Sequence, residues 1–487
     1  MEISEERTTT RDGLTVKIVP MNAINGKSSE PKTKEQKPAD GGVRAWLVCA
    51  GSFLCNGILF GIINTYGVIY AYLTKHSKDE NSDTKASLVG SLAIGSTFVV
   101  SVLAGVMTDN FGIRRTAFLG ASLSALGLFV ASFCVHNFPG LYASYGLMFG
   151  IGASLIYTPS LVILGHYFKH RLGLANGIVT AGSSVFTIAL PYFLEYLIED
   201  IDLKYTFIVL SAIIGFLMIV VCVFKPVITE KSNATHIRGP PCCPNASWVA
   251  KIINVNNWKN KRYVVWCLSI PMALFGYFVP YVHLIKYVEE NLPSSDGKVL
   301  MMCIGATSGI GRILTGFISD LPKVNGIVLQ QISFISIGIL TMLITVANDF
   351  SYLIAIACFL GIFDGCFISL IGPIAFKLCG ASGASQAIGT LLAFCSVPLT
   401  FGPPVAALLR HYTGSYTASF IAAGCSPIIG AILMSLMHCL KQKENPQYHY
   451  TKANGGVMET SANDVTVNSE KSLSQSQTLD TQNNVNV

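Results

Sequence analysis

The stretch AWLVCAGSFLCNGILFGIINTYGVIYAYL, residues 45–73, carries no charged side chain from end to end. About 20 apolar residues in an α-helix are enough to cross the hydrocarbon core of a bilayer. Lipid offers backbone amides no hydrogen-bond partner, so a crossing segment must satisfy its own, as a helix does. A water-facing helix would instead need a polar side. The stretch therefore predicts a transmembrane helix.

Eleven further apolar stretches follow, at residues 86–108, 113–135, 139–165, 174–197, 203–226, 262–287, 298–320, 326–347, 351–378, 385–409 and 416–440. The composition agrees, with 51% hydrophobic residues, 12% charged residues and a mean hydropathy of +0.52. We therefore expect an all-α membrane protein with twelve transmembrane helices. The sequence has no Gly-rich nucleotide loop and no HExxH motif. It thus predicts neither an enzyme nor a nucleic-acid partner, and neither a cofactor nor a metal site.

A polar segment at residues 227–261 divides the twelve stretches into six and six. The predicted organisation is therefore two six-helix bundles, 45–226 and 262–440, joined by this loop. Residues 1–44 and 441–487 are rich in Ser, Thr, Asn, Gln, Lys and Glu, a composition typical of disordered tails.

The loops alternate in charge, and this alternation predicts the orientation of the chain. One set is basic and includes Arg114, Arg115 and Arg171, whereas the other includes Glu195, Glu199, Asp200 and Asp202. Basic loops stay in the cytosol. We therefore expect both tails and the central loop on the cytosolic side of the plasma membrane.

One short motif occurs at matching places in the two halves. Gly105-Val-Met-Thr-Asp109 closes the second stretch, and Gly316-Phe-Ile-Ser-Asp320 closes the eighth. Either aspartate can pair with a neighbouring helix, and Asp109 can also pair with Arg114 and Arg115, which follow it. Such a pair would hold a cytosolic gate shut. An ordinary helix cap beside positive-inside charge is the alternative.

Two charged residues lie deep inside predicted spans: Arg312 in the eighth and Asp364 in the tenth. An unpaired charge at that depth costs several kcal/mol, so such residues usually face a cavity or each other. We expect an Arg312–Asp364 pair that binds a substrate carboxylate and ammonium. Gly309, Gly311 and Gly365 flank it and leave room. The alternative is a salt bridge that only joins two helices.

Other polar and aromatic residues within spans are candidates for the wall of a central cavity. His283 follows Pro280, which interrupts the seventh span and frees backbone groups. The further candidates are Asn64, Tyr66, Tyr157 and Tyr281. Polar residues in bundles also bridge helices, and a lone His is often a satisfied core residue, so both alternatives stay open.

Several longer runs resemble a known family. They are PSLVILGHYF (159–168), RLGLANG (171–177), TAGSSVF (180–186), residues 276–287, CIGATSGIGR (303–312) and FDGCFIS (363–369). The chain resembles the monocarboxylate transporters of the major facilitator superfamily, and within them the branch that carries aromatic amino acids and thyroid hormones. The two aspartate motifs likewise resemble the loop motif of the superfamily, with Arg171 in the corresponding loop.

The resemblance implies facilitated diffusion by alternating access, with Arg312 as carboxylate anchor and with Asp364 and His283 at substrate positions. Proton-linked members carry a Lys in the first span and an Asp one turn before the Arg of the eighth. Here these positions are Asn64 and Ser308. The thyroid-hormone carrier has a His in the first span where this chain has Ile63.

The sequence thus predicts a uniporter of aromatic amino acids, with iodothyronines as a further candidate substrate. A proton-linked carrier of lactate-type monocarboxylates and a non-transporting solute receptor or scaffold are the alternatives. Beyond the substrate and the bilayer, the C-terminal tail offers two partner motifs. Asn445-Pro446-Gln447-Tyr448 is typical of a PTB-domain ligand, and the last three residues could add a strand to a PDZ domain.

Overall fold

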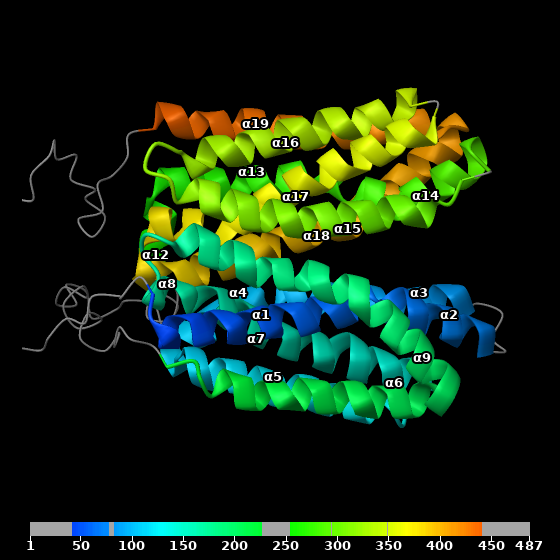
Figure 1. The fold of residues 1–487 in the computed structure, drawn as a ribbon, viewed down its shortest axis with the longest axis horizontal. Coiled ribbons are helices and arrows are strands. Elements are labelled where there is room, and N and C mark those ends of the chain that lie inside the picture. The colour runs from blue at the N-terminus through cyan, green and yellow to red at the C-terminus, as the bar shows by residue number, and fades with distance from the viewer. Residues whose placement is uncertain (1–40, 77–81, 226–253, 294, 348, 441–487) are drawn as a thin grey trace, which may run out of the picture. The chain divides into compact units, whose positions relative to one another are not determined.

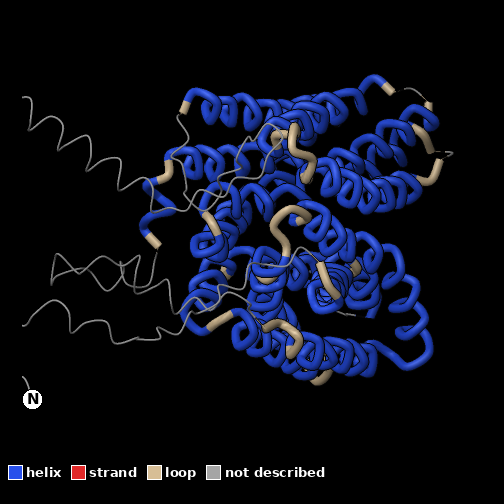
Figure 2. The backbone as a smooth tube through the Cα atoms, turned by 60° about the vertical axis from the view of Figure 1, so that its left-hand side comes forward, coloured by secondary structure: helices blue, strands red, loops and turns tan. Residues whose placement is uncertain are grey.

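A computed structural model describes residues 41–76, 82–225, 254–293, 295–347 and 349–440. Within these ranges the secondary structure is helical, with no strand (Figure 2). The PTB and PDZ motifs, most of both predicted tails and residues 227–253 of the central loop lie outside the described residues.

The N-terminal half begins with α1 (Val43–Asn64), two residues before the predicted start of the first bundle. Its remaining elements are α2 (Tyr66–His76), α3 (Ser82–Val99), α4 (Ser101–Phe111), α5 (Ile113–Ala131), α6 (Phe138–Leu141), the π-helix η2 (Tyr142–Phe149), α7 (Gly150–Val162), α8 (Leu164–Tyr167) and α9 (Leu172–Val221).

The C-terminal half begins with α12 (Val255–Lys259), a short helix inside the segment predicted as central loop. It continues with α13 (Lys261–Tyr277), α14 (Val279–Asn291), α15 (Gly297–Ser319), α16 (Gly326–Leu343), the 3-10 helix η3 (Ile344–Val346), α17 (Phe350–Cys379), α18 (Ala381–Thr413) and α19 (Tyr416–Cys439). Phe278 separates α13 from α14, and Pro280 lies in the first turn of α14, where a proline is tolerated.

The described residues contain ten helices that are long and apolar enough to cross a membrane, and α3 with the adjoining α4 forms an eleventh span bent by 43°. The longest helix, α9, is broken at Asp202, whose φ of 71° lies in the left-handed region. Its two parts, 172–201 and 203–221, are each of membrane length. Counted separately, they bring the spans to twelve.

Contacts between helix ends show that α13 runs in the opposite direction to α17 and α19. Asn260, before α13, donates to the carbonyl of Leu378 at the end of α17, at 2.8 Å. Arg262 likewise donates to the carbonyl of Met437 near the end of α19, at 3.1 Å. We call this the α1 end of the protein, because α1 and α13 begin there. The opposite end, where α2 and α14 finish, is the α2 end (Figure 1).

Within each half, small and aromatic side chains fill the space between helices, and the outer faces are apolar. Trp266 is fully buried, and its indole N–H donates to the Gln330 side chain at 2.8 Å. Large side chains such as Phe133, Ile219 and Ile310 are exposed. In a membrane, exposed apolar side chains face lipid tails that are as apolar as they are. Hydrophobic burial therefore does not drive the helices together, and close packing between them does.

Candidate functional site

The two halves of the chain meet most closely where α9 lies beside α15 (Figure 1). A Cβ atom added to Gly177 would overlap the carbonyl oxygen of Arg312, and one added to Gly316 would overlap that of Gly173. Backbone therefore rests directly on backbone, and only glycine fits at these positions. We call this contact the α9–α15 seam.

A second contact between the halves joins α4 to α18. A Cβ added to Gly105 would lie 2.6 Å from the carbonyl oxygen of Ser385. The Ser101 hydroxyl donates to the carbonyl of Gly389 at 2.8 Å. These contacts, like the seam near Gly173, lie toward the α1 end. The structure is therefore closed between the halves at that end.

The two motif aspartates reach across these contacts. Asp320, just after α15, accepts hydrogen bonds from the backbone N–H groups of Gly173 at 2.7 Å and Leu174 at 2.8 Å. These groups form the N-terminus of α9, where a negative charge is favoured by the helix dipole. Asp109 lies beside Ser385 and Gln386 in the first turns of α18. Each motif thus places a carboxylate at the start of a helix from the other half.

The arginines of the first motif take no part in these contacts. Arg114 and Arg115 are exposed, and among the described residues no ion pair joins either of them to Asp109. Arg171 is exposed immediately before α9. The sequence offered the motif aspartates two kinds of partner, a neighbouring helix or the loop arginines. Asp320 is bound to a neighbouring helix, α9.

Deep in the C-terminal half, Arg312 of α15 faces Asp364 of α17. The two residues are 8% and 3% exposed, and Arg312 Nη2 lies 3.7 Å from Asp364 Oδ2. Gly311 permits the approach of the two helices, because a Cβ there would lie 2.5 Å from the carbonyl oxygen of Ile362. The pair that the sequence predicted is therefore formed, at longer than hydrogen-bond distance.

Each member of the pair has other partners. The Tyr277 hydroxyl donates to Asp364 Oδ1, and the Ser308 hydroxyl donates to Oδ2. Arg312 Nη1 donates to the carbonyl of Thr180 at 2.5 Å and to the Ser183 hydroxyl, both on α9. The guanidinium is thus held by the N-terminal half and the carboxylate by the C-terminal half.

One buried polar atom of the pair has no partner among the described residues, the Arg312 Nε. The Tyr281 hydroxyl lies close to Tyr277 and Asp364. A buried donor left without an acceptor costs roughly 1–3 kcal/mol, and more when it belongs to a charged group. The site therefore has unused hydrogen-bonding capacity that an anionic or polar ligand would fill.

Aromatic rings surround this polar centre. The Tyr281 ring stacks on Phe278, with centroids 5.5 Å apart, and lies 5.5 Å from the Tyr277 ring. Tyr277 in turn packs against Phe367 at 5.7 Å. From the N-terminal half, Tyr157 lies near Arg312. A charged centre enclosed by aromatic rings suits a ligand with charged and aromatic parts.

The other predicted site residues lie elsewhere. His283 contacts the carbonyl of Pro403 at 3.1 Å, and its ring lies 5.8 Å from Tyr416. Asn64 donates to the Thr187 hydroxyl at 3.0 Å, and Tyr66 donates to the carbonyl of Ala86 at 2.6 Å. None of these contacts involves Arg312 or Asp364, so a substrate role for these residues stays a prediction.

Sequence reasoning did not single out Tyr277, Thr180 or Ser183, which hold the charged pair. Thr180 and Ser183 are three residues apart, so they share a face of α9. Hydroxyl residues are common in membrane helices, however, so the TAGSSVF run indicated the family without indicating a role for these two residues.

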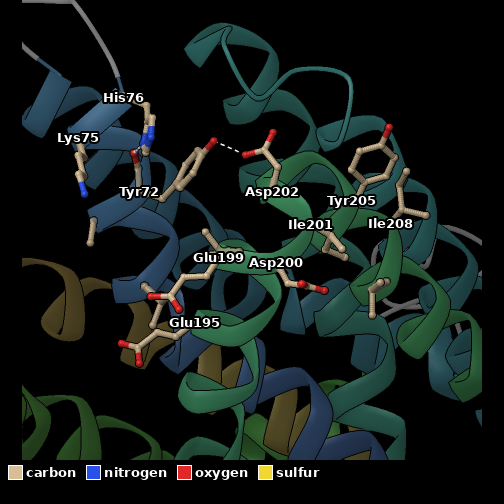
Figure 3. A pocket seen from close by; sticks show the side chains of 14 residues that line it. Tyr72, Lys75, His76, Glu195, Glu199, Asp200, Ile201, Asp202, Tyr205 and Ile208 are labelled. Atoms are coloured by element: carbon tan, nitrogen blue, oxygen red, sulfur yellow. Dashed lines mark hydrogen bonds between the residues drawn. The ribbon is translucent and has the colours of Figure 1, made fainter.

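A separate hollow of about 1120 Å³ lies at the α2 end, lined by α2 and α9 (Figure 3). The Tyr72 hydroxyl points to Asp202 and donates to it, and Glu195, Glu199 and Asp200 line the same wall. All lining residues belong to the N-terminal half. The hollow is therefore distinct from the Arg312–Asp364 site.

The profile of the Major Facilitator Superfamily matches residues 45–330, more than half of the chain. Two solved structures have the same fold. The human organic anion transporter MFSD10 superposes with a TM-score of 0.62 over 80% of this chain and 98% of its own, at 14% identity. The Escherichia coli fucose:proton symporter FucP superposes with a TM-score of 0.65 over 80% and 99%, at 11% identity. The predicted all-α fold is confirmed, and the chain is a membrane transporter of this superfamily, not an enzyme.

Similarity in sequence is higher to named monocarboxylate transporters. Monocarboxylate transporter 10 of Homo sapiens is 46% identical over 410 residues, which cover 82% of this chain and 79% of the relative. The Danio rerio protein of that name is 45% identical over 414 residues, covering 84% and 81%. Monocarboxylate transporter 4 of Mus musculus is 25% identical over 417 residues, covering 84% and 87%. The chain belongs to the monocarboxylate transporter family, as its sequence motifs predicted.

Proposed function

We propose that this chain is a facilitative uniporter of aromatic amino acids that works by alternating access, with iodothyronines as a further candidate substrate. One observation carries the proposal: a buried Arg–Asp pair that is not closed, with an unpartnered arginine Nε, surrounded by aromatic rings. An amino acid zwitterion with an aromatic side chain complements every part of this arrangement.

The proposed roles follow from the chemistry of each group. Arg312 binds the carboxylate, because a guanidinium can hold both oxygens with parallel N–H bonds. Asp364 accepts from the α-ammonium and keeps the arginine charge balanced. Tyr277, Phe278 and Tyr281 form the wall for the aromatic ring. His283, farther along α14, shapes the cavity beyond them.

Alternating access requires the two halves to rock about a site near the midplane. The structure has the α1 end closed by the α9–α15 seam, with Asp320 at the start of α9. We propose that Asp109 and Asp320 latch this end through the helix N-termini of the other half, beside the exposed Arg114, Arg115 and Arg171 of the adjoining loops. It faces the cytosol if the basic loops are cytosolic, in a carrier of the plasma membrane.

Transport without proton coupling is proposed because neutral residues occupy the two positions at which proton-linked members of the family carry a Lys and an Asp. Asn64 and Ser308 cannot exchange protons near neutral pH, and Ser308 instead donates a hydrogen bond to Asp364. Arg312 is always charged.

The test is uptake of labelled tryptophan and tyrosine into cells expressing the chain, at external pH 6 and 7.5, with lactate uptake measured beside it. Saturable aromatic uptake at equal rates at both pH values, without lactate uptake, supports the proposal. Lactate uptake that rises as the pH falls contradicts it and indicates a proton-linked carrier. Solute binding without net flux indicates a receptor.

A further inference from the structure

The Arg312–Asp364 pair is buried, yet it is not a tight salt bridge. Charge-assisted N–H···O bonds between arginine and a carboxylate are usually about 2.7–2.9 Å long. Here the ion-pair distance is 3.7 Å. Opposite charges in a low-dielectric interior attract strongly. Something must therefore keep these two groups apart.

The restraint is visible on both sides of the gap. Tyr277 and Ser308 hold the two carboxylate oxygens of Asp364 on the side of the C-terminal half. Ser183 and the carbonyl of Thr180 hold Nη1 of Arg312 on the side of the N-terminal half. The guanidinium is thus pulled toward α9 and away from α17.

We propose that Ser183 is a positioning residue that keeps the Arg312–Asp364 pair open, so that the head group of an amino acid zwitterion can enter between the two charges. This inference rests on the proposed function and deepens it. The Arg312 Nε is buried without a partner among the described residues. It shares one edge of the guanidinium with Nη2, and this edge is the one a carboxylate binds side-on.

The arrangement also makes the carboxylate site composite. Arg312 belongs to the C-terminal half, whereas Ser183 belongs to the N-terminal half. When the halves separate along the α9–α15 seam, Arg312 loses both α9 acceptors. The open form of the charged pair therefore exists only while the α1 end is closed.

Ser183 can be tested against a matched neighbour. Ser184 is the next residue of α9 and is 6% exposed, against 7% for Ser183. Its side chain lies against Gly309, and among the described residues it makes no hydrogen bond to Arg312. Ser183→Ala removes the hydroxyl that accepts from Arg312. Ser184→Ala removes a neighbouring buried hydroxyl, and Ser183→Thr keeps a hydroxyl at position 183.

The experiment measures inhibition of labelled tryptophan uptake by unlabelled tryptophan and by tryptophan amide, at matched surface level. The amide keeps the ring and the ammonium but lacks the carboxylate. In the wild type, tryptophan should bind more tightly than the amide. Ser183→Ala should lower the apparent affinity for tryptophan roughly tenfold, which is the effect of losing one hydrogen bond to a charged group. In Ser183→Ala, the concentration of tryptophan amide needed for inhibition should equal that of the wild type.

Ser184→Ala and Ser183→Thr should keep the wild-type preference for tryptophan over its amide. If Ser183→Ala also keeps the full preference while the wild type transports tryptophan, Ser183 does not position Arg312, and the inference is wrong although the proposed function stands. If the wild type carries tryptophan without distinguishing it from the amide, Arg312 is not the carboxylate anchor, and the inference is wrong. If the wild type does not carry tryptophan, the proposed function fails, and this inference fails with it.

Discussion

Replacing Asp320 with Asn should open the α9–α15 seam. The carboxylate of Asp320 accepts hydrogen bonds from two backbone N–H groups of the other half, those of Gly173 at 2.7 Å and Leu174 at 2.8 Å. Both bonds exist only while the α1 end is closed. An asparagine has the same shape but offers one acceptor oxygen and no charge.

The magnitude follows from these two bonds. A hydrogen bond to a charged group contributes roughly 1.5–3 kcal/mol, and a charge at a helix N-terminus adds about 0.3–1 kcal/mol. The asparagine loses one bond and weakens the other to a neutral one. Asp320 is half-buried, so the low end of each range applies. We therefore expect the closed state to lose about 2 kcal/mol, which shifts the ratio of open to closed protein about thirtyfold, since each 1.4 kcal/mol is a factor of about ten.

Cysteine labelling at the seam measures this shift. Ser319 faces Gly173 across the seam, because a Cβ on Gly173 would overlap its hydroxyl. Ser319→Cys is introduced into the purified chain with and without Asp320→Asn, and maleimide labelling of the peptide that contains it is followed by mass spectrometry. Reading one peptide separates this thiol from the other cysteines. The Asp320→Asn substitution should raise the labelling rate about thirtyfold, in proportion to the open population.

Asp296→Asn is the matched control. Asp296 also accepts from a backbone N–H, that of Lys298 at 2.9 Å, but within its own helix and at the α2 end. It should leave the labelling rate at residue 319 unchanged. Equal rates with and without Asp320→Asn would show that Asp320 does not hold the seam closed. An equal rise in the Asp296→Asn control would show that the effect does not come from the seam.

Arg312→Ala should abolish tryptophan uptake at normal surface level, because it leaves Asp364 buried without its countercharge, at a cost of about 3–5 kcal/mol; normal uptake would contradict the site. Gly177→Val should arrest transport without loss of surface protein, because its side chain would overlap the Arg312 carbonyl; cycling at the wild-type rate would show that the seam need not close. Ser308→Asp should make uptake depend on external pH between 6 and 7.5, because two adjacent carboxylates share a proton. A flat profile in that variant would show that this position is not sufficient for proton coupling.

The fold was largely predictable from the sequence, because membrane helices are long and apolar. The break between the fifth and sixth spans is an example, since the predicted gap of residues 198–202 contains Asp202, where α9 is broken. The Arg312–Asp364 pair was also predictable, because each charge is conspicuous in an apolar span and needs a partner.

The partners of that pair were not predictable. Ser183 and Tyr277 are ordinary members of their helices, and their importance arises from how α9, α13, α15 and α17 pack. Tyr66 is a further example: its polar hydroxyl made it a cavity candidate, and the packing gives that hydroxyl a carbonyl of α3 as its partner. A sequence shows that a polar group needs a partner, but only the packing shows which one it has.

The glycines of the α9–α15 seam have a consequence for the speed of transport. Where side chains interlock, separating two helices exposes apolar area at about 25 cal/mol per Å². At Gly177 and Gly316 there are no side chains to expose, and backbone lies against backbone. The hydrophobic contribution to the barrier is therefore small at these positions. A few polar contacts are left to set the height of the barrier, and water can replace these as the gap opens.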